Sequence, residues 1–156
     1  MGIDNIFMKL AIEEANFAQI RGEVPVGAVI INSQREIIAR SGNRVRELKD
    51  PTAHAEILAI RSACHNLKTQ NLSNCTIFVT LEPCSMCASA ISFARMKTLA
   101  YGINDNKSGG IENGCCVYNH RQTHHKPEVF SGFCEEEIHH IMKKFFEKLR
   151  LRQPKL

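Results

Sequence analysis

Two short stretches of the chain hold residues that could do chemistry together. His54 and Glu56 stand one alanine apart in "PTAHAEILAIR", and Cys84 and Cys87 are three apart in "TLEPCSMCASA". A helix brings residues three or four apart onto one face, so the two cysteines can share one side of a helix. His54 and Glu56 are two apart and do not form such a pair. We expect both to lean from a helix start toward whatever lies in front of it.

The types and spacing of these residues favour a metal centre. In an open α/β sheet, neighbouring crossover helices begin together at the carboxyl ends of the strands, so His54, Cys84 and Cys87 would converge. One histidine and two cysteines form a zinc ligand set. Three protein ligands leave the fourth tetrahedral position for a water or hydroxide, as in catalytic zinc sites. Glu56 would then move protons between that water and a leaving group.

The residues alone leave alternatives to a catalytic zinc open. A lone Cys-x-x-Cys is often a redox motif, but that would leave His54 and Glu56 without a role. A structural zinc would need a fourth ligand, which Cys64, Cys75 or one of the clustered histidines could supply. Inert buried cysteines are common singly but account poorly for the joint pattern. His-x-Glu followed by Pro-Cys-x-x-Cys is the signature of zinc deaminases, which favours the catalytic site.

Several helices and strands must position these residues. Hydrophobic spacing and turn residues predict, in chain order, a helix over 4–21, strands over 26–31 and 37–39, a helix over 50–66, a strand over 76–81, a helix over 85–93, a strand over 98–101, a loop over 102–127, an edge strand over 128–130 and a helix over 134–152. Continuous strands alternating with helices predict an α/β fold. We expect a three-layer α/β/α arrangement with a central, mixed five-stranded sheet.

Apolar residues give a first estimate of the core. The predicted first helix would bury one side, which consists of Ile6, Phe7, Leu10, Ala11, Phe17 and Ala18. Four phenylalanines are assigned to the interior of the protein: Phe7, Phe17, Phe78 and Phe93. Residues of the helix over 85–93 could serve either the core or a subunit interface: Ala88, Ala90, Ile91 and Phe93. Further histidines are expected at the surface rather than at a second metal: His120, His124, His125, His139 and His140.

Composition and charge narrow the class of protein. The length of 156 residues fits one domain, residues 1–156, and 44% hydrophobic with 23% charged residues is typical of globular proteins. No apolar stretch approaches the roughly 20 residues of a membrane span, and no secretory segment is visible at the start. These features predict a cytoplasmic protein without a membrane partner. Seven cysteines in such a chain indicate reduced thiols or metal ligands rather than disulfides.

The net charge of +4 is concentrated near the C-terminus. Residues 143–156 contain a single acid and the following basic residues: Lys143, Lys144, Lys148, Arg150, Arg152 and Lys155. Cations at a helix C-terminus complement the helix dipole, and they can also contact phosphates. The charge pattern alone favours the first of these roles and leaves the second open.

Motifs along nearly the whole chain resemble those of the cytidine-deaminase-like enzymes, and specifically the bacterial tRNA-specific adenosine deaminases. The matching stretches are "EVPVGAV", "GNR", "DPTAHAE", "LEPCSMC", "DNKSG" and "FFEKLR". The His-Ala-Glu and Pro-Cys-x-x-Cys parts identify the superfamily. The "PVG" stretch, the Asp-x-Lys loop and the Phe-Phe-x-x-x-Arg ending indicate the tRNA branch. The chain departs from the family pattern at Ser89 and over residues 110–116.

The resemblance implies a role for each matching residue. His54, Cys84 and Cys87 would hold one zinc per subunit, and Glu56 would be the proton shuttle. The remaining residues would bind substrate: Asn43 and Ala55 at the extruded nucleotide, Asp105 and Lys107 in a loop beside the anticodon, and Phe146 and Arg150 on the final helix, 134–152. The implied reaction is hydrolytic deamination of the wobble adenosine to inosine in the anticodon stem-loop of tRNA, by a homodimer.

Two other functions would also account for some features of this sequence. A small-molecule deaminase acting on cytosine, guanine or cytidine would need the same zinc site but not a basic, aromatic final helix. A non-catalytic zinc-bearing RNA-binding subunit would not need Glu56, since zinc binding does not require it.

Overall fold

The structure is a computed structural model that describes residues 4–152 of the chain. Its elements are, in chain order, α1 (Asp4–Ile20), β1 (Gly27–Ile31), β2 (Ile37–Gly42), α2 (Val45–Leu48), α3 (Ala55–Leu67), β3 (Thr76–Leu81), α4 (Ser85–Phe93), β4 (Thr98–Ile103), the 3-10 turn η1 (Val117–Asn119), β5 (Glu128–Ser131) and α5 (Glu135–Arg152). Lys155, one of the basic residues near the C-terminus, lies outside the described residues.

The five strands form one sheet in the order β2-β1-β3-β4-β5. β1 pairs antiparallel with both β2 and β3, whereas β3 and β4, and β4 and β5, run parallel. The prediction of a mixed five-stranded sheet is therefore confirmed. β3 and α4 have the predicted bounds, whereas β2 and β4 run beyond their predicted ends to Gly42 and Ile103.

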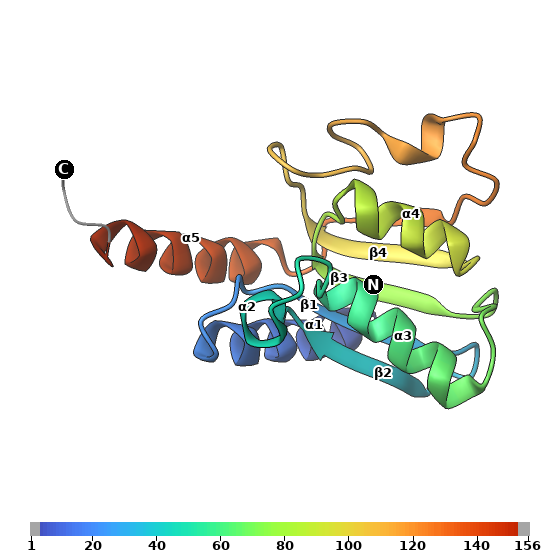
Figure 1. Cartoon of the computed structure of the whole chain (residues 1–156), viewed down its shortest axis with the longest axis horizontal. Coiled ribbons are helices and arrows are strands. Elements are labelled where there is room, and N and C mark those ends of the chain that lie inside the picture. The colour runs from blue at the N-terminus through green and yellow to red at the C-terminus, as the bar shows by residue number, and fades with distance from the viewer. Residues whose placement is uncertain (1–3, 153–156) are drawn as a thin grey trace.

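Helices cover both faces of the sheet, which gives the predicted three layers (Figure 1). Side chains alternate along a strand. On β3, Ile77 and Val79 belong to the core beneath α3 and α4, and Phe78 belongs to the core beneath α1 and α5. The C-terminal part of α5 runs out beyond the sheet (Figure 1). Within residues 4–152, none of the helices is long and apolar enough to cross a membrane.

The contact of α1 with the sheet depends on a glycine. A Cβ atom added at Gly27 would collide with the carbonyl oxygen of Ala11 and the backbone nitrogen of Ala15. Without a side chain at this position, the backbone of α1 can lie directly against β1. This close approach accounts for the glycine of the "PVGAV" stretch.

The second long helix begins later than predicted. Asp50 does not open it, because its carboxylate accepts hydrogen bonds from the backbone N–H of Thr52 (2.8 Å) and from the hydroxyl of Thr52 (2.7 Å) and so forms a turn. The chain then extends to His54, the N-cap residue of α3. The four-residue helix α2 was not predicted. The later start places His54 and Glu56 at the beginning of α3.

Three predictions of burial are wrong. Ile6 is 57% exposed, Phe17 is 53% exposed and Phe93 is 84% exposed. The buried face of α1 runs through other residues: Phe7, Met8, Ala11, Ile12, Ala15 and Ala18. This stripe follows the 3.6-residue period of a helix, and Ile6 and Phe17, which are about three turns apart, both lie on the opposite face. Phe93 is the last residue of α4 and turns away from the core that Ala88 and Ile91 enter.

Candidate active site

The starts of α3 and α4 bring three potential metal ligands together. His54 is the N-cap residue of α3 and Cys84 is the N-cap residue of α4, and neither side chain caps its own helix. Both side chains are therefore free to point forward. Cys87 lies in the first turn of α4 and is fully buried. Positive helix N-termini favour anionic groups, so this position suits thiolates.

The distances among these side chains fit a tetrahedral zinc site. The ligand atoms of His54, Cys84 and Cys87 all lie within 4.8 Å of one another. His54 Nδ1 lies 3.6 Å from Cys84 Sγ and 3.5 Å from Cys87 Sγ. Zinc bonds of about 2.0 Å to nitrogen and about 2.3 Å to sulfur place ligating N and S atoms roughly 3.5 Å apart at a tetrahedral angle. The three residues could therefore hold zinc without rearrangement, through Nδ1 of His54.

The pKa values of the two cysteines are shifted in opposite directions. Hydrogen bonds from Cys87 and His54 lower the pKa of Cys84 to about 4, against the opposing effect of burial. The hydrogen bond to Cys84, together with burial, raises the pKa of Cys87. The hydrogen bond with Cys84 also raises the pKa of His54. A thiolate is thus already present at neutral pH, and a metal would displace the proton that the pair retains.

Glu56 faces this cluster from inside the protein. It is the second residue of α3 and only 3% exposed. Its Oε2 is buried and has no hydrogen-bond partner among residues 4–152. Burial raises the pKa of its carboxyl group to about 7. A carboxyl group with a pKa near neutrality and one unoccupied oxygen can both accept and donate a proton, as a general acid–base group must.

Asn43 fixes the start of α3. It is 7% exposed, and its Oδ1 accepts a hydrogen bond of 2.8 Å from the backbone N–H of Ala55. Arg21 Nη2 in turn donates to the carbonyl oxygen of Asn43 at 3.1 Å. Since Oδ1 is occupied by the protein, the amide Nδ2 is the group that remains to donate to a ligand.

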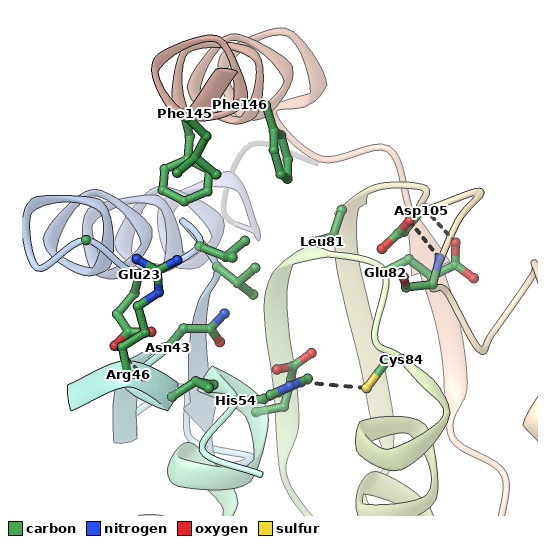
Figure 2. A pocket seen from close by; sticks show the side chains of 17 residues that line it. Glu23, Asn43, Arg46, His54, Leu81, Glu82, Cys84, Asp105, Phe145 and Phe146 are labelled. Atoms are coloured by element: carbon green, nitrogen blue, oxygen red, sulfur yellow. Dashed lines mark hydrogen bonds between the residues drawn. The ribbon is translucent and has the colours of Figure 1, made fainter. Parts of the chain in front are cut away.

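A cavity of about 360 Å³ opens in front of these groups. Among its lining residues are several that the sequence indicated: Asn43, His54, Glu56, Cys84, Asp105 and Phe146. Figure 2 shows the side chains of Phe145 and Phe146 descending from α5 over the cavity, opposite His54 and Asn43. The cavity is thus bounded by the metal cluster at one end and by α5 at the other.

Four predicted site residues lie off the cavity surface. Cys87 and Ala55 are fully buried behind it. Lys107 is exposed on the loop after β4, where its backbone N–H donates to Asp105 Oδ1 at 3.0 Å. Arg150 is exposed on α5 and does not line the cavity. Within residues 4–152, the three ligands described above are the one His/Cys/Asp/Glu group close enough to hold a metal, and it includes none of the five further histidines.

The cavity lining that sequence reasoning missed includes three charged residues and one aromatic residue: Glu23, Arg46, Glu82 and Phe145. Glu23 is 2% exposed and caps α2, since its Oε1 accepts from the N–H groups of Arg46 and Glu47 at 2.9 Å each. The signal in the sequence for Glu23 and Glu82 was an acidic residue inside a mostly apolar motif, "EVPVGAV" and "TLEPC".

Glu82 accepts an unusual number of hydrogen bonds for one carboxylate. Burial by itself would raise its pKa, but hydrogen bonds from Asp105, Asn113 and Glu112 outweigh that effect and lower the pKa below its ordinary value. All of these donors belong to the loop that follows β4. Glu82 therefore remains ionised at neutral pH.

Comparison with known proteins agrees with this geometry. The family model of MafB19-like deaminases matches residues 3–150. The tRNA-specific adenosine deaminase of Agrobacterium fabrum is 51% identical over 145 residues, which cover 93% of this chain and 95% of that protein. A solved structure from a study of A-to-I editing by tRNA:A34 deaminases is 51% identical with a TM-score of 0.85, and the match covers 86% of this chain and 97% of that one.

Guanine deaminase from Bacillus subtilis also has a similar structure. It is 29% identical, with a TM-score of 0.64, and the match covers 97% of this chain and 96% of that one. The fold and the His/Cys/Cys/Glu arrangement thus define a deaminase of the cytidine-deaminase-like class. Within that class, the chain belongs to the MafB19-like deaminase family and groups with the tRNA-specific adenosine deaminases.

Replacing one of the clustered thiols tests the metal site. Cys87→Ser is expected to lower zinc affinity by at least about 100-fold, because the hydroxyl is a far weaker ligand than a thiolate. Competition with a chromophoric chelator measures this affinity. Cys115→Ser, at an exposed cysteine, is the matched control and should bind zinc as the unmodified chain does. Equal affinities for the two variants would contradict the assignment.

Proposed function

We propose that this protein is a zinc-dependent hydrolase that converts the wobble adenosine of tRNA to inosine in the anticodon loop. The observation that carries this proposal is the position of the buried Glu56 carboxyl group, whose Oε2 has no partner within residues 4–152, beside the His54, Cys84 and Cys87 cluster. The reaction class is supported by the family, and the substrate by the names of the relatives that are 51% identical.

In this proposal His54, Cys84 and Cys87 would hold one zinc ion per chain, with water as the fourth ligand. When bound, zinc would supply a water that loses a proton near neutral pH. Glu56 would take that proton and deliver it to N1 of the adenine while the oxygen adds to C6. Glu56 would then take the remaining proton from the added oxygen and pass it to the amine on C6. The C6–N bond breaks, ammonia leaves, and the ring keeps the oxygen as inosine.

Binding of the base is assigned to the inner end of the cavity. Asn43 would donate from Nδ2 to the extruded nucleotide, and the buried Ala55 would form the wall behind it. An unpaired base in an anticodon loop costs little to extrude, because it has no partner strand to leave. A cavity of about 360 Å³ has room for a base.

Recognition of the surrounding RNA is assigned to the outer end. Phe146 is 44% exposed at the mouth of the cavity, which suits stacking on a neighbouring base. Arg150 lies one helical turn further along α5 and would contact phosphate. Asp105 would line the opposite side, and Lys107, exposed on the same loop, would contact the RNA outside the cavity. In this scheme residues 1–156 form one deaminase domain, helix 134–152 is its RNA-contacting element, and the protein works in the cytoplasm, where tRNA is used.

We also propose that the protein is a homodimer. Phe93 is 84% exposed at the end of α4, an unusual position for so large an apolar side chain. Phe93 borders a shallow hollow whose lining includes Arg61 and Gln70 but consists mainly of apolar residues, among them Ile57, Ile60, Ala90 and Ala94. A second copy packing on this surface would bury Phe93.

A second candidate function is deamination of a free nucleobase such as guanine. The structural similarity to Bacillus subtilis guanine deaminase supports it, at 29% identity. The basic final helix argues against it, because a free base has no phosphates to contact.

Loss of the proton carrier tests the reaction and the substrate together. Glu56→Gln is expected to slow inosine formation in tRNA by a factor of about 10²–10⁴, because the amide cannot carry a proton. Reverse-transcription sequencing of total tRNA measures inosine at the wobble position. Glu36→Gln, in the exposed β1–β2 turn, is the control. Unchanged editing by the Glu56 variant, or ammonia from guanine with unmodified tRNA, would refute the proposal.

Removing one cation tests whether α5 contacts RNA. Arg150→Gln is expected to weaken binding of an anticodon stem-loop and to reduce the dependence of log Kd on log salt concentration by about 1, because one phosphate contact is lost. Fluorescence anisotropy over a salt series measures both quantities. Lys97→Gln removes one positive charge just before β4, at the end of that strand away from the cavity. This control variant should leave the dependence of log Kd on log salt concentration unchanged. Equal slopes for the two variants would exclude the contact.

Sedimentation velocity tests the proposed dimer. The unmodified chain is expected to sediment as a dimer and Phe93→Asp as a 17.6 kDa monomer, because a buried unpaired carboxylate opposes association. Phe130→Asp changes a phenylalanine that is 52% exposed on β5 and should remain dimeric. A dimeric Phe93 variant, or a monomeric unmodified chain, would rule out this interface.

A further inference from the structure

One buried carboxylate holds both ends of the loop that borders the cavity. Glu82 is 2% exposed and directly follows β3. Its Oε2 accepts from Asp105 N at 2.9 Å and from Asn113 Nδ2 at 2.7 Å. Its Oε1 accepts from three consecutive backbone N–H groups, those of Ile111 (3.1 Å), Glu112 (2.9 Å) and Asn113 (3.0 Å). All five donors belong to residues 105–113, here called the 105–113 loop.

The loop folds closely around this carboxylate. A Cβ atom added at Gly109 would lie 2.5 Å from Glu82 Cδ, so only a glycine fits there. Gly110 N donates to the carbonyl oxygen of Pro83 at 2.8 Å, and Asp105 Oδ1 accepts from the backbone N–H groups of residues 107 and 108 at 3.0 Å each. Apart from an isolated β-bridge between Gly109 and Cys84, the loop has no regular structure that could hold this shape. Glu82 supplies five of the hydrogen bonds that fix its conformation, more than any other side chain described above.

The anchored loop forms one wall of the cavity. Asp105 and Ser108 line it, and Figure 2 shows Asp105 and Glu82 joined on the side away from Asn43 and Arg46. The Glu82 carboxylate is occupied by the loop, whereas the metal cluster and the proton carrier face the reacting end. Glu82 is thus placed to shape the wall that a bound RNA would meet and not to take part in proton transfer.

We propose that Glu82 is a positioning residue that sets the 105–113 loop for binding the anticodon loop. This inference rests on the proposed tRNA substrate and deepens it. It accounts for a buried acid that the reaction does not use. It also accounts for how residues 110–116, which depart from the family pattern, still present Asp105 at the cavity.

A single amide substitution separates the two ends of the loop. In Glu82→Gln, the remaining oxygen can satisfy the three N–H groups of residues 111–113. The new NH₂ group then meets two donors, Asp105 N and Asn113 Nδ2. The amide of Asn113 can turn to present its oxygen, but Asp105 N cannot change and is left unpaired. The end of the loop that lines the cavity is therefore the end released.

The test compares Glu82→Gln with Glu128→Gln, an exposed acid on β5. Glu82→Gln should raise KM for an anticodon stem-loop about 10-fold and leave kcat within roughly 3-fold, since binding is lost and the proton carrier is kept. Zinc content should be unchanged. Hydrogen exchange measured by mass spectrometry should quicken in peptides covering 105–113 but not in those covering α4. Glu128→Gln should match the unmodified chain in every measurement.

A reciprocal substitution checks the contact itself. In the protein, the Asn113 amide donates to Glu82 Oε2 at 2.7 Å. Asn113→Asp alone would place a second carboxylate against that of Glu82, and the repulsion should displace the loop and raise KM. When it is combined with Glu82→Gln, the amide introduced at position 82 can donate to the carboxylate introduced at position 113. The double variant should therefore bind RNA better than the sum of the single effects predicts. Additive effects would contradict a direct role of this pair.

The outcomes distinguish this inference from the proposed function. Loss of zinc, a fall in kcat with unchanged KM, or unaltered hydrogen exchange in 105–113 would overturn the positioning role of Glu82. An unmodified chain that never forms inosine in tRNA would overturn the proposed function instead. In that case the exchange rates of 105–113 still decide whether Glu82 holds the loop.

Discussion

The site depends on the meeting of two helix starts at one edge of the sheet. α3 and α4 begin beside each other, so His54 from one and Cys84 from the other reach contact distance although 30 positions separate them in the chain. The extended backbone at both N-cap residues turns their side chains forward instead of onto their own helices. The depressed pKa of Cys84, the burial of Cys87 and the direction of Glu56 all follow from this arrangement. A shift of either helix along the sheet would separate the four residues.

Around this centre, hydrogen bonds to buried polar side chains fix the starts of two helices and one loop. Asn43 holds the start of α3, Glu23 holds α2, and Glu82 holds the loop after β4. Each of these side chains is less than a tenth exposed, so each bond is shielded from competing water. The cavity walls near the metal cluster are therefore held by hydrogen bonds, whereas the outer wall includes two phenylalanines of a helix that extends away from the sheet.

Local patterns in the sequence predicted those parts of the fold and site that are encoded locally. The strand over 76–81 and the helix over 85–93 have the predicted bounds, because a continuous apolar run, Pro83 and the Cys-x-x-Cys spacing mark them clearly. The convergence of His54 with Cys84 followed from a general rule about crossover helices. The start of α3 was misplaced, because the side chain of Asp50 closes a turn where a proline rule predicts a helix. The anchoring by Glu82 could not be predicted, because its partners lie 23 to 31 positions away in a loop without periodicity.

The oxygen of Glu56 that has no partner within residues 4–152 has a consequence for folding. A buried polar group without a partner costs about 1–3 kcal/mol, a large part of the roughly 5–15 kcal/mol that separates folded from unfolded domains. Until a metal-bound water or a reactant supplies the missing partner, the native state bears this cost, so filling the cavity should stabilise the fold. Substitutions that strengthen the core elsewhere, far from the cavity, are the means by which such a chain can offset this loss. The stability of the fold can therefore be raised in the core without changing the carboxylate in the cavity.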